Sequence, residues 1–321
     1  MAADSRYPDT PIADIETGKV RTVSVHERPA KVSLEHLGQP VPAGATLDQW
    51  LGSMPDAPGV SGVREAAQAI RTARRDGRAV LLGMGAHPIK VGLGPLIREA
   101  VADGIFTGIA TNGAAIIHDY EMALAGNTSE DVDAALMGGS FGMVEETSVA
   151  LNGAIHEAAG KGEGIGLAVG RLIAEGGLPN AGVSVFAAAY RHRIPATVHV
   201  ALGTDIIHMH PSCDPAATGQ ATMNDFRLFT RQVAALEKGV FINMGSAVII
   251  PEIFLKACSL SLNLGHSLEG LTTVNMDFVQ HYRPRVNVLG RPTRSGGRGI
   301  SLTGHHEILF PLLLAALREA P

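Results

Sequence analysis

The feature that most constrains the fold is a repeated alternation of short apolar runs with helix-like stretches of 10 to 15 residues. Residues 79–82, 198–202 and 240–244 are strand-like runs, and each breaks at its C-terminal end into small, polar or imidazole residues. Strands that alternate with helices are typical of right-handed crossovers and a parallel sheet. The pattern therefore predicts an α/β fold, Rossmann-like and doubly wound, with a mostly parallel sheet.

The same pattern divides the chain into an arm and a single domain. Residues 1–60 are rich in Pro and Asp with weak periodicity, which indicates an irregular N-terminal arm, and 61–321 form one domain. Helical spacing predicts helices over 63–75, 94–102, 141–176 with an interruption at 160–164, 183–193, 224–238 and 305–319. Strands are expected over 78–83, 106–111, 195–202, 240–249 and 271–276, and the basic stretch 283–298 is expected to be a loop.

Composition excludes several functional classes. The 321 residues are 45% hydrophobic, enough for a packed core, and the net charge of −5 comes without a dominant basic run that would bind nucleic acid. Cys213 and Cys258 lie far apart, which argues against a disulfide framework or a cysteine-type zinc site. No apolar run reaches the ~18 residues of a membrane span, so a cytoplasmic protein without a membrane partner is expected.

Two turns that follow strand-like runs contain glycine or alanine at positions where a ligand could approach the backbone. Gly83–His87 leads into a helix, as phosphate-binding turns do, although its spacing matches neither GxGxxG nor a Walker A loop. Thr111–Gly113 is a second such turn. Two small-residue turns side by side favour a nucleotide ligand, and the alternative is that the glycines serve only tight turns.

Imidazoles and carboxylates gather at the same predicted edge. His118 and Asp119 could act as a general acid/base pair, or could be a satisfied histidine beside a helix-start aspartate. His208 and His210, two residues apart, would face the same way on an extended chain and could bind a metal with Asp205, His199 or His305. Alternatively they line a ligand pocket or serve structure alone. His305 and His306 begin the last helix and are expected to face the pocket.

With these segments in order, the chain resembles the deoxyhypusine synthase family from about Val80 to the C-terminus. The resemblance rests on 80–98 followed by Thr111–Gly113, on 194–205, on 245–248, on 274–275 and on the terminal Ile308–Leu313. It implies an NAD-binding Rossmann-like enzyme of the transferase/oxidoreductase kind, in which NAD takes a hydride from spermidine. It also implies a homotetramer with active sites between paired subunits.

The resemblance implies a set of NAD-binding positions and a set of departures from the family. The implied NAD contacts are Gly85, Ala86, His87, Thr111, Asn112, Gly113, Asp205, Gly245, Ser246, Asn275, Met276, His305 and His306. The family's catalytic lysine falls in 280–292, which contains no lysine, and arginine cannot replace it because its guanidinium stays protonated. Glu252, Arg283 and Arg285 are the expected substrate-binding residues, and the arginines suit a phosphate or carboxylate.

Three functional classes follow. The leading one is a deoxyhypusine synthase-like NAD-dependent enzyme that acts on a small amine such as a polyamine, or on another small substrate, without a lysine imine. His118, Asp119, Asp205, His208 and His305 are its expected catalytic residues, and no metal is expected. The alternatives are a metal-dependent hydrolase or lyase built from Asp205, His208, His210 and His305, and a non-catalytic NAD-binding sensor.

Overall fold

A single six-stranded sheet organises the computed structural model, which describes residues 17–318. All adjacent strands are parallel, and their order is β3-β2-β1-β4-β5-β6. The strands are β1 (Val80–Met84), β2 (Gly108–Asn112), β3 (Ala196–His199), β4 (Val240–Met244), β5 (Thr272–Asp277) and β6 (Arg298–Thr303). This order is that of a doubly wound Rossmann-like sheet, so the predicted fold class is confirmed.

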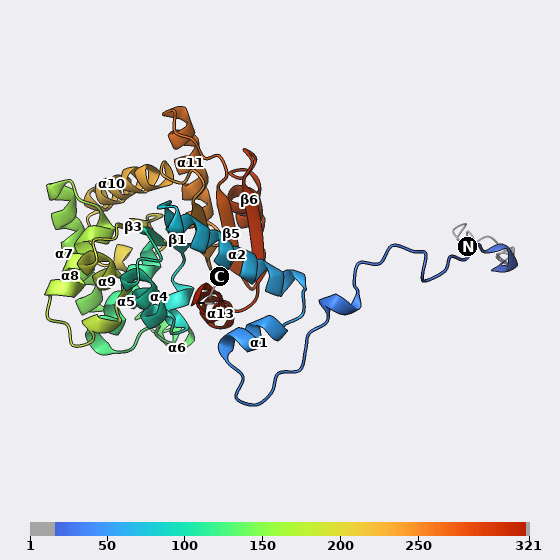
Figure 1. Cartoon of the computed structure of the whole chain (residues 1–321). Coiled ribbons are helices and arrows are strands. Elements are labelled where there is room, and N and C mark those ends of the chain that lie inside the picture. Colours follow the sequence, from blue (N-terminus) through green and yellow to red (C-terminus); the bar gives the residue numbers. More distant parts are fainter. Residues whose placement is uncertain (1–16, 319–321) are drawn as a thin grey trace, which may run out of the picture.

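Helices cover both faces of the sheet (Figure 1). They are α1 (Leu47–Ser53), α2 (Pro58–Arg75), α3 (His87–Lys90), α4 (Gly94–Ala102), α5 (Gly113–Ala125), α6 (Val132–Leu136), α7 (Glu145–Lys161), α8 (Ile165–Glu175), α9 (Val185–Arg191), α10 (Pro215–Val233), α11 (Ile249–Asn263), α12 (Tyr282–Pro284) and α13 (His306–Arg318). Short 3-10 turns are η1 (Thr17–Lys19), η2 (Leu34–His36), η3 (Ala181–Val183) and η4 (Ile206–His208), and η5 (Arg285–Gly290) is a π-helix.

Alternating side chains of the strands divide the core into two layers. Leu82 belongs to the cluster that includes side chains of α2, α4 and α13, whereas Leu81 belongs to a second cluster with α10 and α11. In that second layer the rings of Phe241 and Phe254 stack with centroids 3.7 Å apart. Both faces of β1 and β4 are buried, which explains why these two strands are mostly apolar.

Helix α10 packs along β3, the strand at one edge of the sheet. The Asp225 carboxylate accepts hydrogen bonds from the amides of Val198 (2.9 Å) and Gly166 (3.0 Å). The Thr222 hydroxyl accepts from the amide of Val200 and donates to the carbonyl of Val198. Side chains of a helix thus replace a neighbouring strand, which keeps this edge from pairing with another chain.

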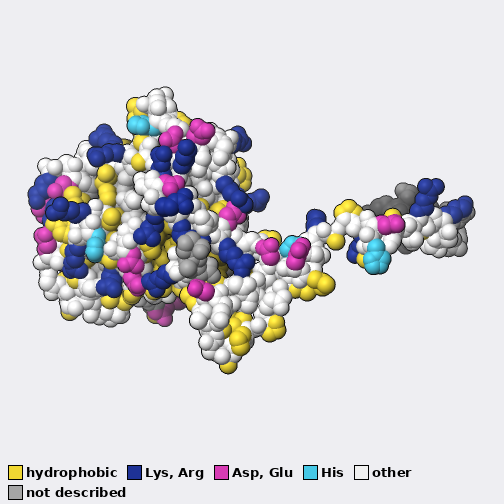
Figure 2. All heavy atoms as spheres, in the orientation of Figure 1, with side chains coloured by type: hydrophobic (Ala, Val, Ile, Leu, Met, Phe, Trp, Pro, Cys, Tyr) yellow, Lys and Arg dark blue, Asp and Glu magenta, His cyan; other side chains and the backbone are white. Residues whose placement is uncertain are grey.

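Residues 17–35 extend away from the rest of the molecule (Figures 1 and 2), whereas His36 and Gln39 are hydrogen-bonded to the end of α1 and the segment that follows it. The side chains of residues 17–35 are exposed, among them Val23 and Leu34. The chain joins the body at α1, where Leu51 is buried in the core layer that also contains α13. The predicted start of the domain at residue 61 falls inside α2, which begins at Pro58.

Several predicted boundaries are wrong, and local capping explains two of them. The strand expected over 240–249 ends at Met244, and the Ser246 hydroxyl accepts from the amide of Ile250 in the first turn of α11. Helix α10 begins at Pro215 rather than 224, because the Asp214 carboxylate accepts from the amides of residues 216 and 217. The stretch 283–298 is a loop only over 291–297, because it also contains the end of α12, the π-helix η5 and the first residue of β6.

Within residues 17–318, no helix is both long enough and apolar enough to cross a membrane.

Candidate functional site

The carboxyl ends of the six strands meet at one edge, and the strand order reverses between β1 and β4. In sheets of this kind ligands bind at that reversal. Here the turns after β1 and β4 touch each other: a Cβ on Gly85 would lie 2.4 Å from the carbonyl oxygen of Gly245. The Gly85 amide donates to the carbonyl of Met244 (3.1 Å). Only glycine permits this approach, so Gly85 serves the packing of the two turns.

His306 packs beneath the second of these turns. Its side chain is 1% exposed, and Nε2 donates to the carbonyl of Met276 at 3.1 Å, which leaves Nδ1 without a partner. Gly245 has φ +66°, and a Cβ there would lie 2.9 Å from His306 Cε1. Burial lowers the pKa of His306, so this imidazole is neutral and its Nδ1 is a buried acceptor beside the Gly245 turn.

Aromatic and imidazole rings cluster beside this turn. The rings of His87 and His306 lie 5.4 Å apart between centroids, and Phe278 stands 6.3 Å from each of them. His305 stacks against Phe278 at 6.0 Å with an interplanar angle of 13°. Phe278 is 52% exposed, and His87 and His305 are also exposed. These rings offer planar faces to a planar ligand.

A ladder of side-chain amides fixes the ends of β4, β5 and β6. Asn243 donates to the Asn275 carbonyl oxygen (2.7 Å) and to the Ser246 carbonyl (2.9 Å). Asn275 in turn donates to Gln280 (2.7 Å), which donates to the carbonyl of Leu302. The side-chain amide of Asn275 is therefore occupied by hydrogen bonds inside the protein and does not face the edge where the strands end. The neighbouring Met276 is wholly buried in the core.

Asn243 and Gln280 are site residues that the sequence reasoning missed. A signal did exist for Asn243, because an amide inside the apolar run 240–244 requires a buried partner. Gln280 carried no comparable signal.

A cavity of about 710 Å³ opens at the ends of β2 and β3. Its lining carries four carboxylates, one ammonium group and one imidazole, which belong to Glu121, Glu130, Glu146, Asp205, Lys90 and His118. The remaining lining is mainly apolar or small and comes from α5, α6 and the start of α7. Carboxylates thus outnumber the basic groups, which favours a cationic ligand.

One wall of the cavity is a hydrogen-bonded chain of side chains. His118 Nδ1 lies 2.7 Å from the hydroxyl of Thr128, and that hydroxyl donates to one oxygen of Glu121. The Thr147 hydroxyl donates to the other oxygen at 3.3 Å. Burial, and to a smaller extent the charge of Lys90, lowers the pKa of His118 to about 4. His118 is therefore neutral at pH 7, and Glu121 is held in place by two hydroxyl groups.

Asp205 stands where the cavity meets the strand ends. It is 8% exposed, and its Oδ2 has no hydrogen-bond partner. A Cβ on Gly113 would lie 2.0 Å from that oxygen, so the carboxylate lies directly against the first residue of α5. Burial raises the pKa of Asp205 to about 6. This group can change protonation state near neutral pH, and it lines the cavity although its Oδ2 is buried.

Two other predicted catalytic residues are engaged elsewhere. Asp119 lies on α5 beside His118 in sequence but is buried at the start of α9, where it accepts from the Ser184 hydroxyl and from the amides of residues 185 and 186. His208 Nδ1 accepts from the amides of Gly203 and Asp205, both at 3.2 Å. Both side chains stabilise local structure, and neither lines the cavity.

The histidines proposed as metal ligands do not come together. His210 lies against Glu145 and Ser212. His305 follows β6, whereas His208 follows β3 at the opposite edge, about 24 Å away at ~4.8 Å per strand. In the part of the chain that the structure describes, no group of three or more His, Cys, Asp or Glu side chains is placed to hold a metal ion. The four-residue metal cluster is therefore wrong.

The expected substrate-binding residues form an ion-pair cluster on α11. Glu252 contacts Arg283 (3.3 Å), receives a hydrogen bond from Asn287 (2.9 Å) and pairs with Lys256. The Lys256 ammonium lowers the pKa of Glu252. Arg283 is thus already paired, and Arg285 is exposed at the start of the π-helix η5.

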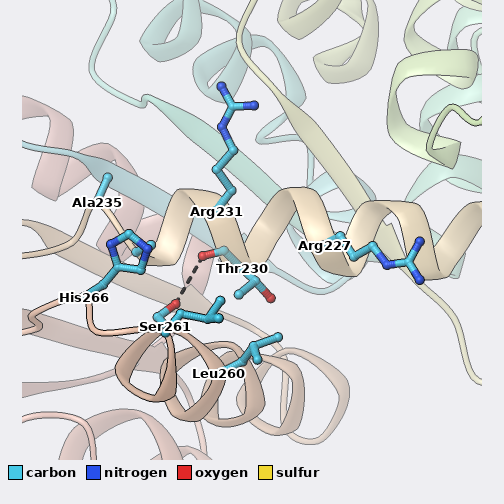
Figure 3. A pocket seen from close by; sticks show the side chains of 9 residues that line it. Arg227, Thr230, Arg231, Ala235, Leu260, Ser261 and His266 are labelled. Carbon is cyan, nitrogen blue, oxygen red and sulfur yellow. Dashed lines mark hydrogen bonds between the residues drawn. The ribbon is translucent and has the colours of Figure 1, made fainter.

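A second, mainly apolar groove of about 400 Å³ lies between α10 and α11 (Figure 3). Leu260 and Leu264 line it, and the Ser261 hydroxyl donates to the Thr230 carbonyl across it. Arg231 extends away from α11 in this view. None of the strand-end residues belongs to this groove, so it is separate from the candidate site.

Comparison with solved structures identifies proteins that share this fold at low sequence identity. No protein-family model matches the chain, and no curated protein matches it by sequence. A putative deoxyhypusine synthase from Entamoeba histolytica superposes with a TM-score of 0.53 at 15% identity, over 87% of this chain and 95% of that one. A conserved putative LOR/SDH protein from Methanococcus maripaludis S2 gives 0.52 at 18% identity, over 91% and 76%.

AgrE, solved as a ternary complex with ornithine and NAD+, gives a TM-score of 0.51 at 14% identity over 79% of this chain. The chain spans only 32% of the length of AgrE. These similarities define the class: an α/β protein whose fold is shared with a putative deoxyhypusine synthase, with a putative LOR/SDH protein and with AgrE.

Proposed function

We propose that the chain is a deoxyhypusine synthase-like, NAD-dependent enzyme of the transferase/oxidoreductase kind that acts on a small amine. The observation that carries the proposal is the carboxylate-lined cavity directly beside the edge where this fold binds nucleotides. Two of its lining residues, Asp205 and Lys90, belong to the segments that follow β3 and β1. The fold supports NAD as the cofactor, and the excess of carboxylates in the cavity supports an amine as the substrate.

The residues at the strand ends fit a dinucleotide. Gly85 lets the turns after β1 and β4 pack together at the point where the strand order reverses, and within residues 17–318 His306 Nδ1 is a buried acceptor without a partner. Gly85, Ala86 and His87 would hold the phosphates, with Asn112 and Gly113 on one side and His305 and His306 on the other. Bound NAD would supply a hydride acceptor.

The position of the cavity supports one orientation of the cofactor. An amine loses hydride only beside the nicotinamide ring, so that ring belongs near Gly113 and Asp205 at the mouth of the cavity. The adenine ring would then lie against the exposed planar faces of the cluster formed by His87, Phe278 and His305. Glu121 would bind an ammonium group, and Asp205 would accept the proton that an amine must lose before oxidation.

The proposal excludes an imine with a protein lysine. The segment 280–292 has no lysine, and Lys256 is paired with Glu252 outside the cavity. Treatment with borohydride in the presence of NAD and spermidine should leave the protein mass unchanged. An adduct mapped to Lys90, the lysine that lines the cavity, would overturn this part of the proposal.

Calorimetric titration tests the proposal as a whole. NAD should bind the purified protein, and Phe278→Ala with His305→Ala should weaken it by about tenfold through lost stacking. Leu264→Ala, in the groove between α10 and α11, is the matched control and should leave NAD binding unchanged. Absence of NAD binding at millimolar concentration would contradict the proposal. NAD binding without reduction of NAD by any amine would favour the non-catalytic sensor.

A further inference from the structure

We propose that the amine bound in this cavity also carries a carboxylate, so that the substrate class is a diamino acid and Lys90 is the residue that selects it. The inference rests on the proposed function, because it concerns the same cavity.

Lys90 is a cation without a partner in the cavity wall. It ends α3, the short helix after the β1 turn, and its positive charge reaches His118 across the cavity. Within residues 17–318 its ammonium makes no ion pair. His118 is neutral and supplies no second positive charge.

The carboxylates of the cavity do not neutralise Lys90. Glu121 accepts from the hydroxyls of Thr128 and Thr147, and Glu130 accepts from the amide of Gly142 (2.8 Å). Asp205 also lines the cavity, and within residues 17–318 it makes no ion pair with Lys90. Lys90 and the carboxylates therefore line one space without pairing with each other.

A ligand with charges of both signs fits this arrangement better than one with a single sign. A plain diamine would place an ammonium group opposite Lys90 as well as opposite the carboxylates. A ligand carrying only anionic groups would meet Glu121, Glu130 and Glu146. A diamino acid presents its carboxylate to Lys90 and its ammonium groups to Glu121 and Asp205. The volume of about 710 Å³ accommodates such a molecule beside a cofactor ring.

The decisive comparison is between L-ornithine and putrescine, which differ only in the carboxylate. Calorimetry with the NAD-loaded full-length protein should show ornithine binding at least tenfold more tightly. Lys90→Met should weaken ornithine by about tenfold to a hundredfold, since a charge-assisted hydrogen bond is lost, and should leave putrescine unchanged or tighter. Lys90→Arg should retain most of the preference. Lys161→Met, an exposed lysine paired with Glu157, is the matched control and should change neither ligand.

Each other result contradicts the inference in a recognisable way. Putrescine binding as tightly as ornithine in the unsubstituted protein overturns it and leaves the amine proposal standing. A loss of NAD affinity in Lys90→Met with unchanged ornithine affinity assigns Lys90 to a cofactor phosphate instead. Binding of NAD but of neither amine removes the amine site, and failure of NAD itself to bind removes the proposed function.

Discussion

At the scale of single residues, substitution of Gly113 tests whether the edge of the sheet where the strands end depends on close packing. A methyl group there would collide with the Asp205 carboxylate at 2.0 Å. We expect Gly113→Ala to lower the free energy of unfolding by about 1–3 kcal/mol, the usual cost of overpacking, and to abolish amine binding. Gly153→Ala is the control, since Gly153 lies exposed in α7 with open space around it, and should be neutral or stabilising by up to ~1 kcal/mol. Urea unfolding of both variants decides between these results.

The raised pKa of Asp205 predicts how the free energy of unfolding changes with pH. Its pKa is about 6 in the folded protein against ~3.9 in an unfolded chain, so the folded state holds this proton more tightly. The stability that protonation contributes is complete below pH ~4 and is lost as the pH rises through about 6, at most about 3 kcal/mol. Asp205→Asn should therefore unfold at higher urea than the unsubstituted protein at pH 8 and match it at pH 4. Equal midpoints at pH 8 would show that this carboxylate is not desolvated.

The same residue predicts how activity changes with pH. A protonated Asp205 cannot take a proton from the amine, so kcat/KM should fall as the pH drops below about 6. Asp205→Asn should remove this limb of the profile along with most of the turnover. A limb that persists in the variant would assign the proton acceptor to another group.

At the scale of elements, the contact between α10 and β3 can be tested through Asp225. Burial raises the pKa of Asp225 to about 7, yet the carboxylate accepts from two buried amides. Asp225→Ala should cost about 2–5 kcal/mol because both amides lose their partner, and Asp225→Asn should cost less because it keeps one acceptor oxygen. Asp133→Ala, at an exposed position on α6, should have little effect. Chemical denaturation at pH 8 measures all three.

The elements also show what the sequence could predict. Alternating apolar runs and helical spacing identify the parallel sheet, because strands buried on both faces and amphipathic helices leave strong periodic signals. The start of α10 was missed because Pro215 and Gly219 suggest a loop, whereas the Asp214 cap supplies the missing stability. Helix α5 was not predicted because its apolar residues lie on most sides and leave little periodicity.

The candidate site was predictable only in part, and the reason is again physical. Asp205 and His118 follow strands that meet at one edge, so their approach to a shared cavity follows from topology. The departure of Asp119 depends on the rotation of about 100° between consecutive helix residues and on the position of α9, neither of which a linear pattern reveals. Glu121 and Glu130 were missed because they come from α5 and the segment after it, away from the strand ends.

At the scale of the whole molecule, we propose that the segment 17–35 contributes to association rather than to folding. Its side chains are exposed, so removing residues 1–35 should leave the urea midpoint of the body unchanged. We expect the full-length chain to form a homotetramer, and loss of the exposed apolar side chains of the segment, including Val23 and Leu34, to lower its mass in light scattering. A full-length chain that is already monomeric would contradict this expectation.

The amide ladder of Asn243, Asn275 and Gln280 divides the strand-end edge into two halves with different freedom to evolve. In the half formed by β4, β5 and β6, polar groups are committed to one another, so most substitutions there would disturb neighbouring strands together. In the half formed by β1, β2 and β3, Lys90 and Asp205 line the cavity and make no ion pair within residues 17–318. Exchanging those two side chains would change which metabolite the protein accepts while the rest of the scaffold stays as it is.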